Sequence, residues 1–256
     1  MTNLHLARHD FGGDPALLLL HGLGATGEVW HHLLERNWPG ETFAPDLPGH
    51  GRSPRLPEYT FSSMAAAVAE VVPPGRQVVV LGHSLGGVLA LMLADGSYGL
   101  DVAAACGVGI KLNWSEAELA KAAEVAARPE RVFATRDEAA DRWLRISGLT
   151  GLLPPDSSDV EAGIVRGDDG WRVAVDPKAF GVGAPDVPAL LAAAKATTIL
   201  AAGERDPMCP PDQLRAVDAD GVVLPATGHN VHVENPLALW PIMDRLLASA
   251  TGALGR

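Results

Sequence analysis

A serine in this sequence stands in a pattern typical of enzyme nucleophiles. Ser84 is the central residue of the segment 82–86, which reads Gly-His-Ser-Leu-Gly and fits Gly-X-Ser-X-Gly. That pattern holds a serine on a sharp turn between a strand and a helix. Residues 78–81 are Val or Leu, and residues 87–94 form an apolar run of helical length. We therefore expect Ser84 at a helix N-terminus, where backbone N–H groups and the helix dipole favour negative charge.

A base and an acid follow Ser84 in the chain. A serine hydroxyl becomes a good nucleophile only when a base removes its proton and a carboxylate orients that base. His229 comes after an apolar segment that ends at residue 224, and Asp206 comes after one that ends at residue 202. Glu204 lies near the same strand end and competes with Asp206 for the role of the acid.

The elements that must position these residues are short strands alternating with helices. Segments rich in Val, Leu and Ile are typical of buried parallel strands and occur at residues 17–20, 77–81, 102–107, 197–202 and 222–224, with a further short strand expected at 42–44. Helices are expected near residues 28–35, at 62–72 and after Pro236. The alternation predicts an α/β fold with a mostly parallel sheet covered by helices on both faces.

One long segment interrupts this alternation. Residues 111–196 contain no obvious core strand, but two helix starts are indicated where Ser115 precedes Glu118 and where Thr135 precedes Glu138. We predict a core made of residues 1–110 and 197–256 and a helical cap made of residues 111–196.

Taken together, these motifs resemble the α/β-hydrolase superfamily, and in particular its capped serine hydrolases of the esterase and lipase type. The resemblance spans nearly the whole chain in the family's order, and only the insertion lacks a signature. It rests on His21-Gly22, on the segments 46–53, 82–87 and 203–207, and on Gly228, His229, His232, Glu234 and Pro236.

The resemblance implies a role for each matching residue. Ser84 would be the nucleophile, His229 the general base and acid, and Asp206, which fits the family pattern better than Glu204, the orienting carboxylate. The backbone N–H groups of Leu23 and Leu85 would form the oxyanion hole. No cofactor is implied. The expected reaction is cleavage of a carboxylic ester through an acyl-enzyme, and lactones or carbon–carbon bonds are alternative substrates of the same residues.

Two competing interpretations use some of the same residues. Residues 22–27 also fit the dinucleotide-binding pattern Gly-X-Gly-X-X-Gly, with Asp46 near the distance expected for a ribose contact. His229, His232 and Glu234 could be metal ligands, although no other cluster supplies the remaining ligands. A dinucleotide site would not explain the serine, acid and histidine in order. His232 and Glu234 precede Pro236 at an expected helix start, where they have a structural role, so we expect no metal. A non-catalytic binding protein on the same fold is the alternative of another class.

Charge and composition exclude several classes of partner. The chain of 256 residues has 20 Lys and Arg against 31 Asp and Glu, a net charge of −11, which opposes binding to nucleic acid or to an anionic membrane. No segment has the length and apolarity of a membrane span or the pattern of a secretion signal, so we expect a cytoplasmic protein. The two cysteines, Cys106 and Cys209, are expected to be buried thiols. The sequence leaves the oligomeric state open.

The expected partner is a medium-sized, largely apolar small molecule held beneath the cap. An insertion at the ends of parallel strands can cover the ligand crevice and line it with apolar groups. Basic residues in or beside the insertion could meet an acidic substrate, although exposed charges are usually solvated; they are Lys111, Arg142, Arg145, Arg166 and Arg172. The candidate lining residues are Trp114, Trp143, Leu153 and Trp171.

Overall fold

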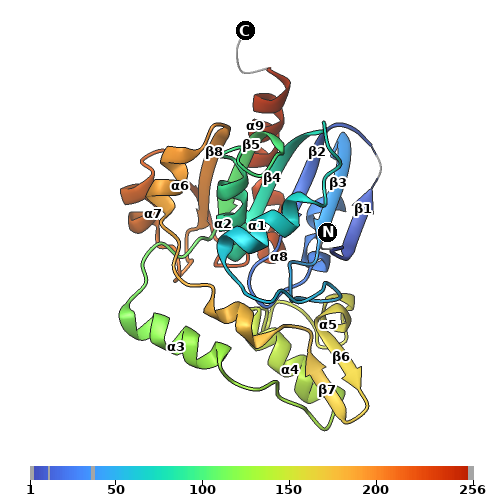
Figure 1. Ribbon diagram of the computed structural model, residues 1–256. Helices are drawn as coiled ribbons and strands as arrows, with labels where there is room; N and C mark the ends of the chain where they lie inside the picture. The colour runs from blue at the N-terminus through green and yellow to red at the C-terminus, as the bar shows by residue number, and fades with distance from the viewer. Residues whose placement is uncertain (1–2, 11, 36–37, 253–256) are drawn as a thin grey trace.

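A seven-stranded sheet forms the centre of the computed structural model, which describes residues 3–10, 12–35 and 38–252. The strand order is β1-β3-β2-β4-β5-β8-β9, and all neighbours are parallel except β1 and β3 (Figure 1). The predicted α/β fold is therefore confirmed. The strands are β1 (Leu6–Asp10), β2 (Gly13–Leu20), β3 (Gly40–Pro45), β4 (Gln77–His83), β5 (Asp101–Val108), β8 (Thr197–Gly203) and β9 (Val222–Leu224).

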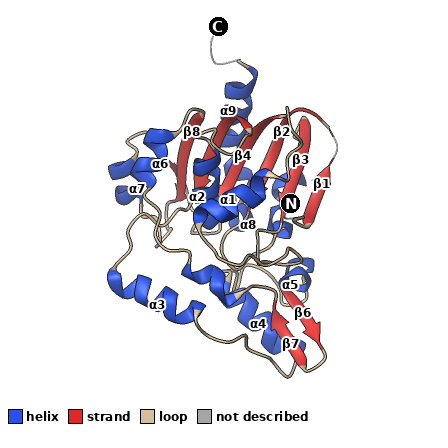
Figure 2. Cartoon of the chain, in the orientation of Figure 1, coloured by secondary structure: helices blue, strands red, loops and turns tan. Residues whose placement is uncertain are grey.

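Both faces of the sheet are covered by helices, as Figure 2 shows. In β2, Leu18 and Leu20 face α1 (Phe61–Ala69) and α2 (Leu85–Leu93), whereas Leu17 and Leu19 face α9 (Trp240–Thr251) and its neighbours. Because successive side chains of a strand point to opposite faces, a strand buried on both sides reads as a continuous apolar run. This is why the core strands are visible in the sequence.

The helix expected at residues 28–35 is absent. The segment forms two short 3-10 turns instead, η1 (Gly27–Trp30) and η2 (Leu33–Glu35). Val29, Trp30 and Leu33 are fully buried, and Thr26 provides no side-chain cap for a helix start. Packing of these large side chains therefore outweighs the helical pattern. The structure also adds the antiparallel edge strand β1, which was not predicted.

The remaining core helices lie toward the C-terminus. They are α6 (Val187–Ala193), α7 (Pro211–Val217), α8 (Val231–Glu234) and the 3-10 turn η4 (Pro236–Leu239), which leads into α9. Val187 of α6 is buried with Leu91 and Leu200 of the core. Helix α6, which lies within the predicted cap range of 111–196, therefore packs on the core.

The insertion between β5 and α6 lies at one end of the sheet (Figure 1). Both predicted capping boxes form, at Ser115 and at Thr135. The cap is not wholly helical, since a hairpin turns at residues 167–170, where Gly-Asp-Asp-Gly favours a turn. Its elements are α3 (Glu116–Ala126), α4 (Arg136–Ile146), α5 (Ser158–Gly163), β6 (Ile164–Gly167), β7 (Gly170–Val173) and η3 (Pro177–Gly181).

Hydrogen bonds tie the cap to loops of the core. The Asp176 N–H donates to the Gly49 carbonyl at 2.7 Å, and the Gly51 N–H donates to the Ala174 carbonyl at 2.7 Å. The Tyr59 hydroxyl donates to the Asp176 carboxylate at 3.0 Å. Burial raises the pKa of Tyr59 to about 12, so this donor keeps its proton at neutral pH. These contacts hold the cap in place over the ends of the strands.

Within the described residues, no helix is long and apolar enough to cross a membrane. Cys106 and Cys209 are both buried and unbonded.

Candidate active site

Ser84 occupies the sharp turn between β4 and α2. Its φ of 50° and ψ of −113° lie in a region that residues with a side chain rarely adopt, so the turn is strained. The Ser84 N–H donates to the Val108 carbonyl at 2.8 Å, which fixes the backbone. A Cβ added to Gly82 would lie 2.0 Å from the Gly86 carbonyl oxygen. The glycines of the motif therefore allow the tight turn that exposes the serine.

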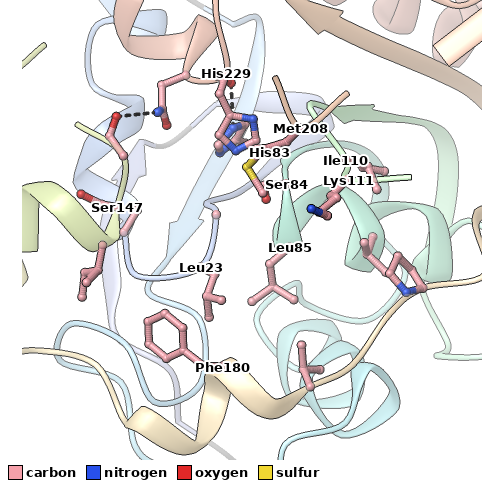
Figure 3. A pocket seen from close by; sticks show the side chains of 18 of the residues that line it. Leu23, His83, Ser84, Leu85, Ile110, Lys111, Ser147, Phe180, Met208 and His229 are labelled. Carbon is pink, nitrogen blue, oxygen red and sulfur yellow. Dashed lines mark hydrogen bonds between the residues drawn. The ribbon is translucent and has the colours of Figure 1, made fainter. Parts of the chain in front are cut away.

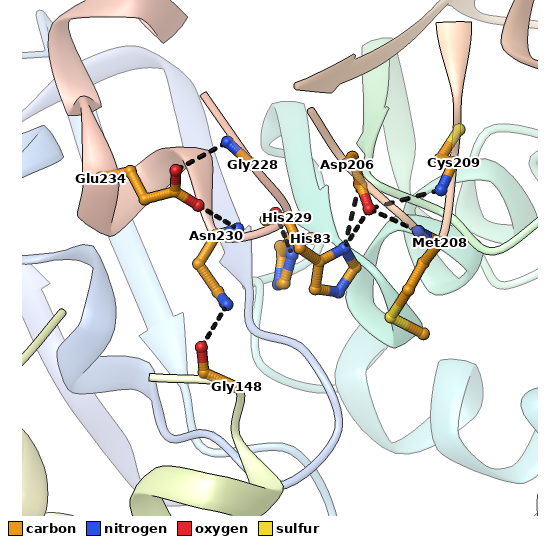
Figure 4. Close-up of polar contacts among 9 residues, drawn as sticks. All are labelled: His83, Gly148, Asp206, Met208, Cys209, Gly228, His229, Asn230 and Glu234. Carbon is orange, nitrogen blue, oxygen red and sulfur yellow. Dashed lines mark hydrogen bonds and ion pairs between the residues drawn. The ribbon is translucent and has the colours of Figure 1, made fainter. Parts of the chain in front are cut away.

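His229 and Asp206 form a direct pair at the neighbouring strand ends. The His229 Nδ1 lies 3.0 Å and 3.1 Å from the two carboxylate oxygens of Asp206 (Figure 4). The buried carboxylate also accepts from the Met208 N–H at 2.8 Å and from the Cys209 N–H at 3.3 Å. A carboxylate held in this way keeps the proton of His229 on Nδ1 and leaves Nε2 free to accept another.

Glu204 lies outside this arrangement. Its carboxylate accepts from the Ala226 N–H at 2.9 Å on the exposed side of the loop. In the described structure no contact joins Glu204 to His229, so the geometry supports Asp206 as the acid.

Ser84 and His229 both line one cavity of about 310 Å³ (Figure 3). Among the described residues the Ser84 hydroxyl has no hydrogen-bond partner, and the bond to His229 is not formed. Catalytic hydrogen bonds are often loose without substrate and tighten when it binds. The cavity wall is largely apolar, which suits a small organic ligand.

The predicted oxyanion donors border the same cavity. Leu23 and Leu85 both line it, and in the described part of the chain neither backbone N–H has a hydrogen-bond partner. The loop before Leu23 lies close to the nucleophile, since a Cβ added to Gly22 would be 3.4 Å from the Ser84 Cβ. Two unpaired N–H groups beside a serine can stabilise the charge of a tetrahedral intermediate.

The residues that line the cavity agree with the predicted lining residues at one position. Trp114 lines the cavity, but Trp143, Leu153 and Trp171 are not among its lining residues. Trp143 is fully buried inside the cap and packs against Gly163, where an added Cβ would be 2.1 Å from its ring. The wall is completed by residues that the sequence analysis did not single out as lining, namely Phe61, Ile146, Phe180, Val182, Pro185 and Met208.

His83 is a further residue of the site that the sequence analysis did not assign. Its Nε2 donates to the backbone carbonyl of His229 at 2.9 Å, and the two rings lie 4.6 Å apart. The ring of His83 also lies 4.5 Å from the ring of His232. Burial lowers the pKa of His83 well below its usual value, so the ring stays neutral. His83 therefore holds the backbone of His229 in place without adding charge.

The competing interpretations do not fit the contacts. Asp46 is buried and accepts from the Gly27 N–H at 2.8 Å and the Arg52 N–H at 2.9 Å, so it holds a turn. The Glu234 carboxylate accepts from the Gly228 N–H at 2.6 Å and from the Asn230 N–H at 3.0 Å. No group of three or more possible metal ligands occurs in the described ranges of the chain.

The strand order and the turn at Ser84 are those of the α/β-hydrolase fold. The sequence profile of the Alpha/beta hydrolase family matches residues 17–240. The chain therefore belongs to the alpha/beta hydrolase family.

Comparisons with individual proteins agree with this family. Lipase LipV of Mycobacterium tuberculosis is 36% identical over 96 residues, 37% of each chain. A pimeloyl-[acyl-carrier protein] methyl ester esterase of Yersinia enterocolitica is 40% identical over 83 residues, 32% of this chain and 31% of that protein. The match thus spans about a third of these relatives.

Solved structures extend the similarity of fold to almost the whole chain. The thioesterase domain from the curacin biosynthetic pathway has a TM-score of 0.74 at 20% identity and covers 95% of this chain and 99% of its own. An esterase from Thermogutta terrifontis has a TM-score of 0.70 at 21% identity, covering 95% and 93%.

The acid can be tested by a matched pair of substitutions. We expect Asp206→Asn to lower kcat for ester hydrolysis by about 10⁴-fold, because the wrong tautomer of His229 would be favoured. Glu204→Gln should lower kcat less than about tenfold, since its bond to the Ala226 N–H lies away from the base. Steady-state kinetics of both folded variants measures the difference, and the reverse order would assign the acid to Glu204.

The role of His83 can be tested by removing and then restoring its donor. We expect His83→Leu to lower kcat by about 10²-fold with little change in KM, because a displaced base misaligns the reaction. His83→Gln keeps an N–H near the position of Nε2 and should recover most of kcat. An equal decrease of kcat in both variants, or an increase of KM with kcat unchanged, would contradict the positioning role.

Proposed function

We propose that this chain is a serine hydrolase that cleaves carboxylic esters through a covalent acyl-enzyme. The observation that carries the proposal is the strained Ser84 turn beside the buried His229 and Asp206 pair, all at one apolar cavity. Strained residues cluster at functional sites, and here the strain exposes a nucleophile. A non-catalytic binding protein would have no need of this turn.

In the first half of the reaction, the Ser84 hydroxyl attacks the ester carbonyl carbon while His229 Nε2 takes its proton. The carbonyl oxygen becomes an oxyanion, which the N–H groups of Leu23 and Leu85 would stabilise. The C–O bond to the alcohol then breaks, and His229 returns the proton to the leaving alcohol. Asp206 supports the positive charge on the imidazole ring during this step.

In the second half, water replaces the alcohol. His229 removes a proton from the water as its oxygen attacks the acyl carbon, and the bond to Ser84 breaks as the serine regains a proton. The products are the free acid and the enzyme in its starting state. Since the side chains supply the nucleophile and the base, and backbone N–H groups supply the oxyanion hole, the proposed reaction needs no metal or cofactor.

The proposed substrate is a medium-sized and largely apolar ester. Support comes from the cavity wall, which includes Leu23, Trp114 and Phe180, and from its volume of about 310 Å³. Relatives named as a lipase and as a methyl ester esterase point in the same direction, although each matches only about a third of its length. Apolar walls discriminate by about 1 to 3 kcal/mol per methylene, so we expect a moderate preference for acyl length.

The proposal is tested by Ser84→Ala on a panel of 4-nitrophenyl esters with short to long acyl chains, together with lactones. Because the nucleophile acts in concert with His229, kcat/KM should fall by at least ~10³-fold for every ester that the wild type cleaves. Ser249→Ala, in α9 and outside the lining of the cavity, serves as the control and should keep wild-type activity. Retention of activity within tenfold by a folded Ser84→Ala protein would overturn the proposal.

A further inference from the structure

The charge of the cavity differs from that of the whole chain. The net charge of the chain is −11, yet no Asp or Glu is among the described residues that line the cavity. Two cations line it instead, Lys111 and Arg145. An acidic protein repels anions in general, so a local excess of positive charge at the reaction site needs an explanation.

Lys111 lies close to the reacting residues. It follows Gly109 by two positions, and a Cβ added to Gly109 would lie 3.3 Å from His229 Nδ1. The side chain of Lys111 is 18% exposed, its Nζ is 5.0 Å from the Trp114 ring centroid, and it pairs with Glu118. The partner Glu118 is 46% exposed and lies outside the lining of the cavity. The Glu118 carboxylate also accepts from the Ser115 N–H at 2.9 Å in the capping box of α3, so Lys111 keeps this partner and Arg145 is the cation without one.

Arg145 approaches from the cap. Arg145 belongs to the last turn of α4, and it is the first residue of the segment 145–148, which lines the cavity. Its Nε donates to the Asp141 carbonyl at 3.1 Å, which leaves the two terminal nitrogens of the guanidinium available. In the part of the chain that the structure describes, no carboxylate pairs with Arg145. An unpaired guanidinium fits a carboxylate because its planar N–H groups match the two oxygens.

The two cations come from different walls of the cavity. Lys111 follows β5 of the core, whereas Arg145 belongs to α4 of the insertion, and both line the cavity. An ester held in the cavity can thus meet one cation from the core and one from the insertion. A carboxylate of the ligand that binds Arg145 does not have to displace Glu118 from Lys111.

We propose that the site selects esters whose acyl chain ends in a second carboxylate, which Arg145 binds and Lys111 supports through its charge. This inference rests on the proposed esterase function and narrows its substrate to half-esters of dicarboxylic acids. The bond changes remain those of ester hydrolysis, and the second carboxylate takes no part in them. The apolar wall between the cations holds the methylene chain.

The test compares two esters of equal carbon number, 4-nitrophenyl hydrogen adipate and 4-nitrophenyl hexanoate. The quantity measured is the ratio of their kcat/KM values, adipate over hexanoate. We expect Arg145→Gln to lower this ratio about tenfold, mainly through KM for the adipate. The ratio of the wild type should also fall as salt is raised, because the guanidinium is exposed to solvent and the interaction is screened.

Two further variants distinguish carboxylate binding at Arg145, here called the subsite, from a general effect of charge on the reaction. Arg142→Gln removes an equally charged, exposed residue of the same helix that does not line the cavity, and should leave the ratio within about twofold of the wild type. Glu118→Gln releases Lys111 and should raise the ratio. Equal ratios for the Arg145 and Arg142 variants, or a ratio that is independent of salt, would overturn the proposal.

A failure of the esterase function itself would look different. In that case the wild type would cleave neither ester. Calorimetric titration of the wild type, Arg145→Gln and Arg142→Gln with monomethyl adipate then tests the subsite directly. Weaker binding by Arg145→Gln alone supports the subsite, and equal binding by all three proteins overturns it.

Discussion

The close approach of backbone at the ends of β2 and β4 is the constraint on which the site depends. Leu20 pairs with Gly82 in the parallel register, and a Cβ added to Gly86 would lie 2.2 Å from the Leu20 carbonyl oxygen. Only glycine permits this spacing, which presses the start of α2 against the sheet. The turn at Ser84 and the N–H of Leu85 are fixed as a result. The cost of the strained turn is offset by the buried strands around it.

Buried histidines surround the site and remain neutral. Desolvation lowers the pKa of His21 to about 4 and the pKa of His232 to about 3. His21 accepts from the Leu47 N–H at 2.8 Å, and His232 packs 4.7 Å from the Trp30 ring. Neutral rings fill space near His229 without competing for its proton or repelling its positive charge during the reaction. The reactive proton is thus confined to the pair of His229 and Asp206.

The sequence predicted what depends on local pattern. Ser84, Asp206 and His229 each follow a strand of continuous apolar residues, and strand ends in a parallel sheet meet at one edge, so their proximity could be foreseen. Features that depend on tertiary packing could not be predicted from the sequence. The helical pattern of residues 28–35 gave way to 3-10 turns, and Trp143 became cap core while Phe180 took a place in the cavity wall. These outcomes depend on tertiary packing, which the local sequence at these residues does not reveal.

Covalent labelling can show whether Ser84 is the nucleophile. The wild-type protein would be treated with a fluorophosphonate, and intact mass and peptide mapping would locate the adduct. We expect a single adduct on the Ser84 hydroxyl, formed in step with the loss of hydrolysis and slowed in Asp206→Asn, because the base then no longer activates the serine. An adduct on another residue that abolishes hydrolysis, or full labelling of Ser84 with hydrolysis unchanged, would show that Ser84 is not the nucleophile.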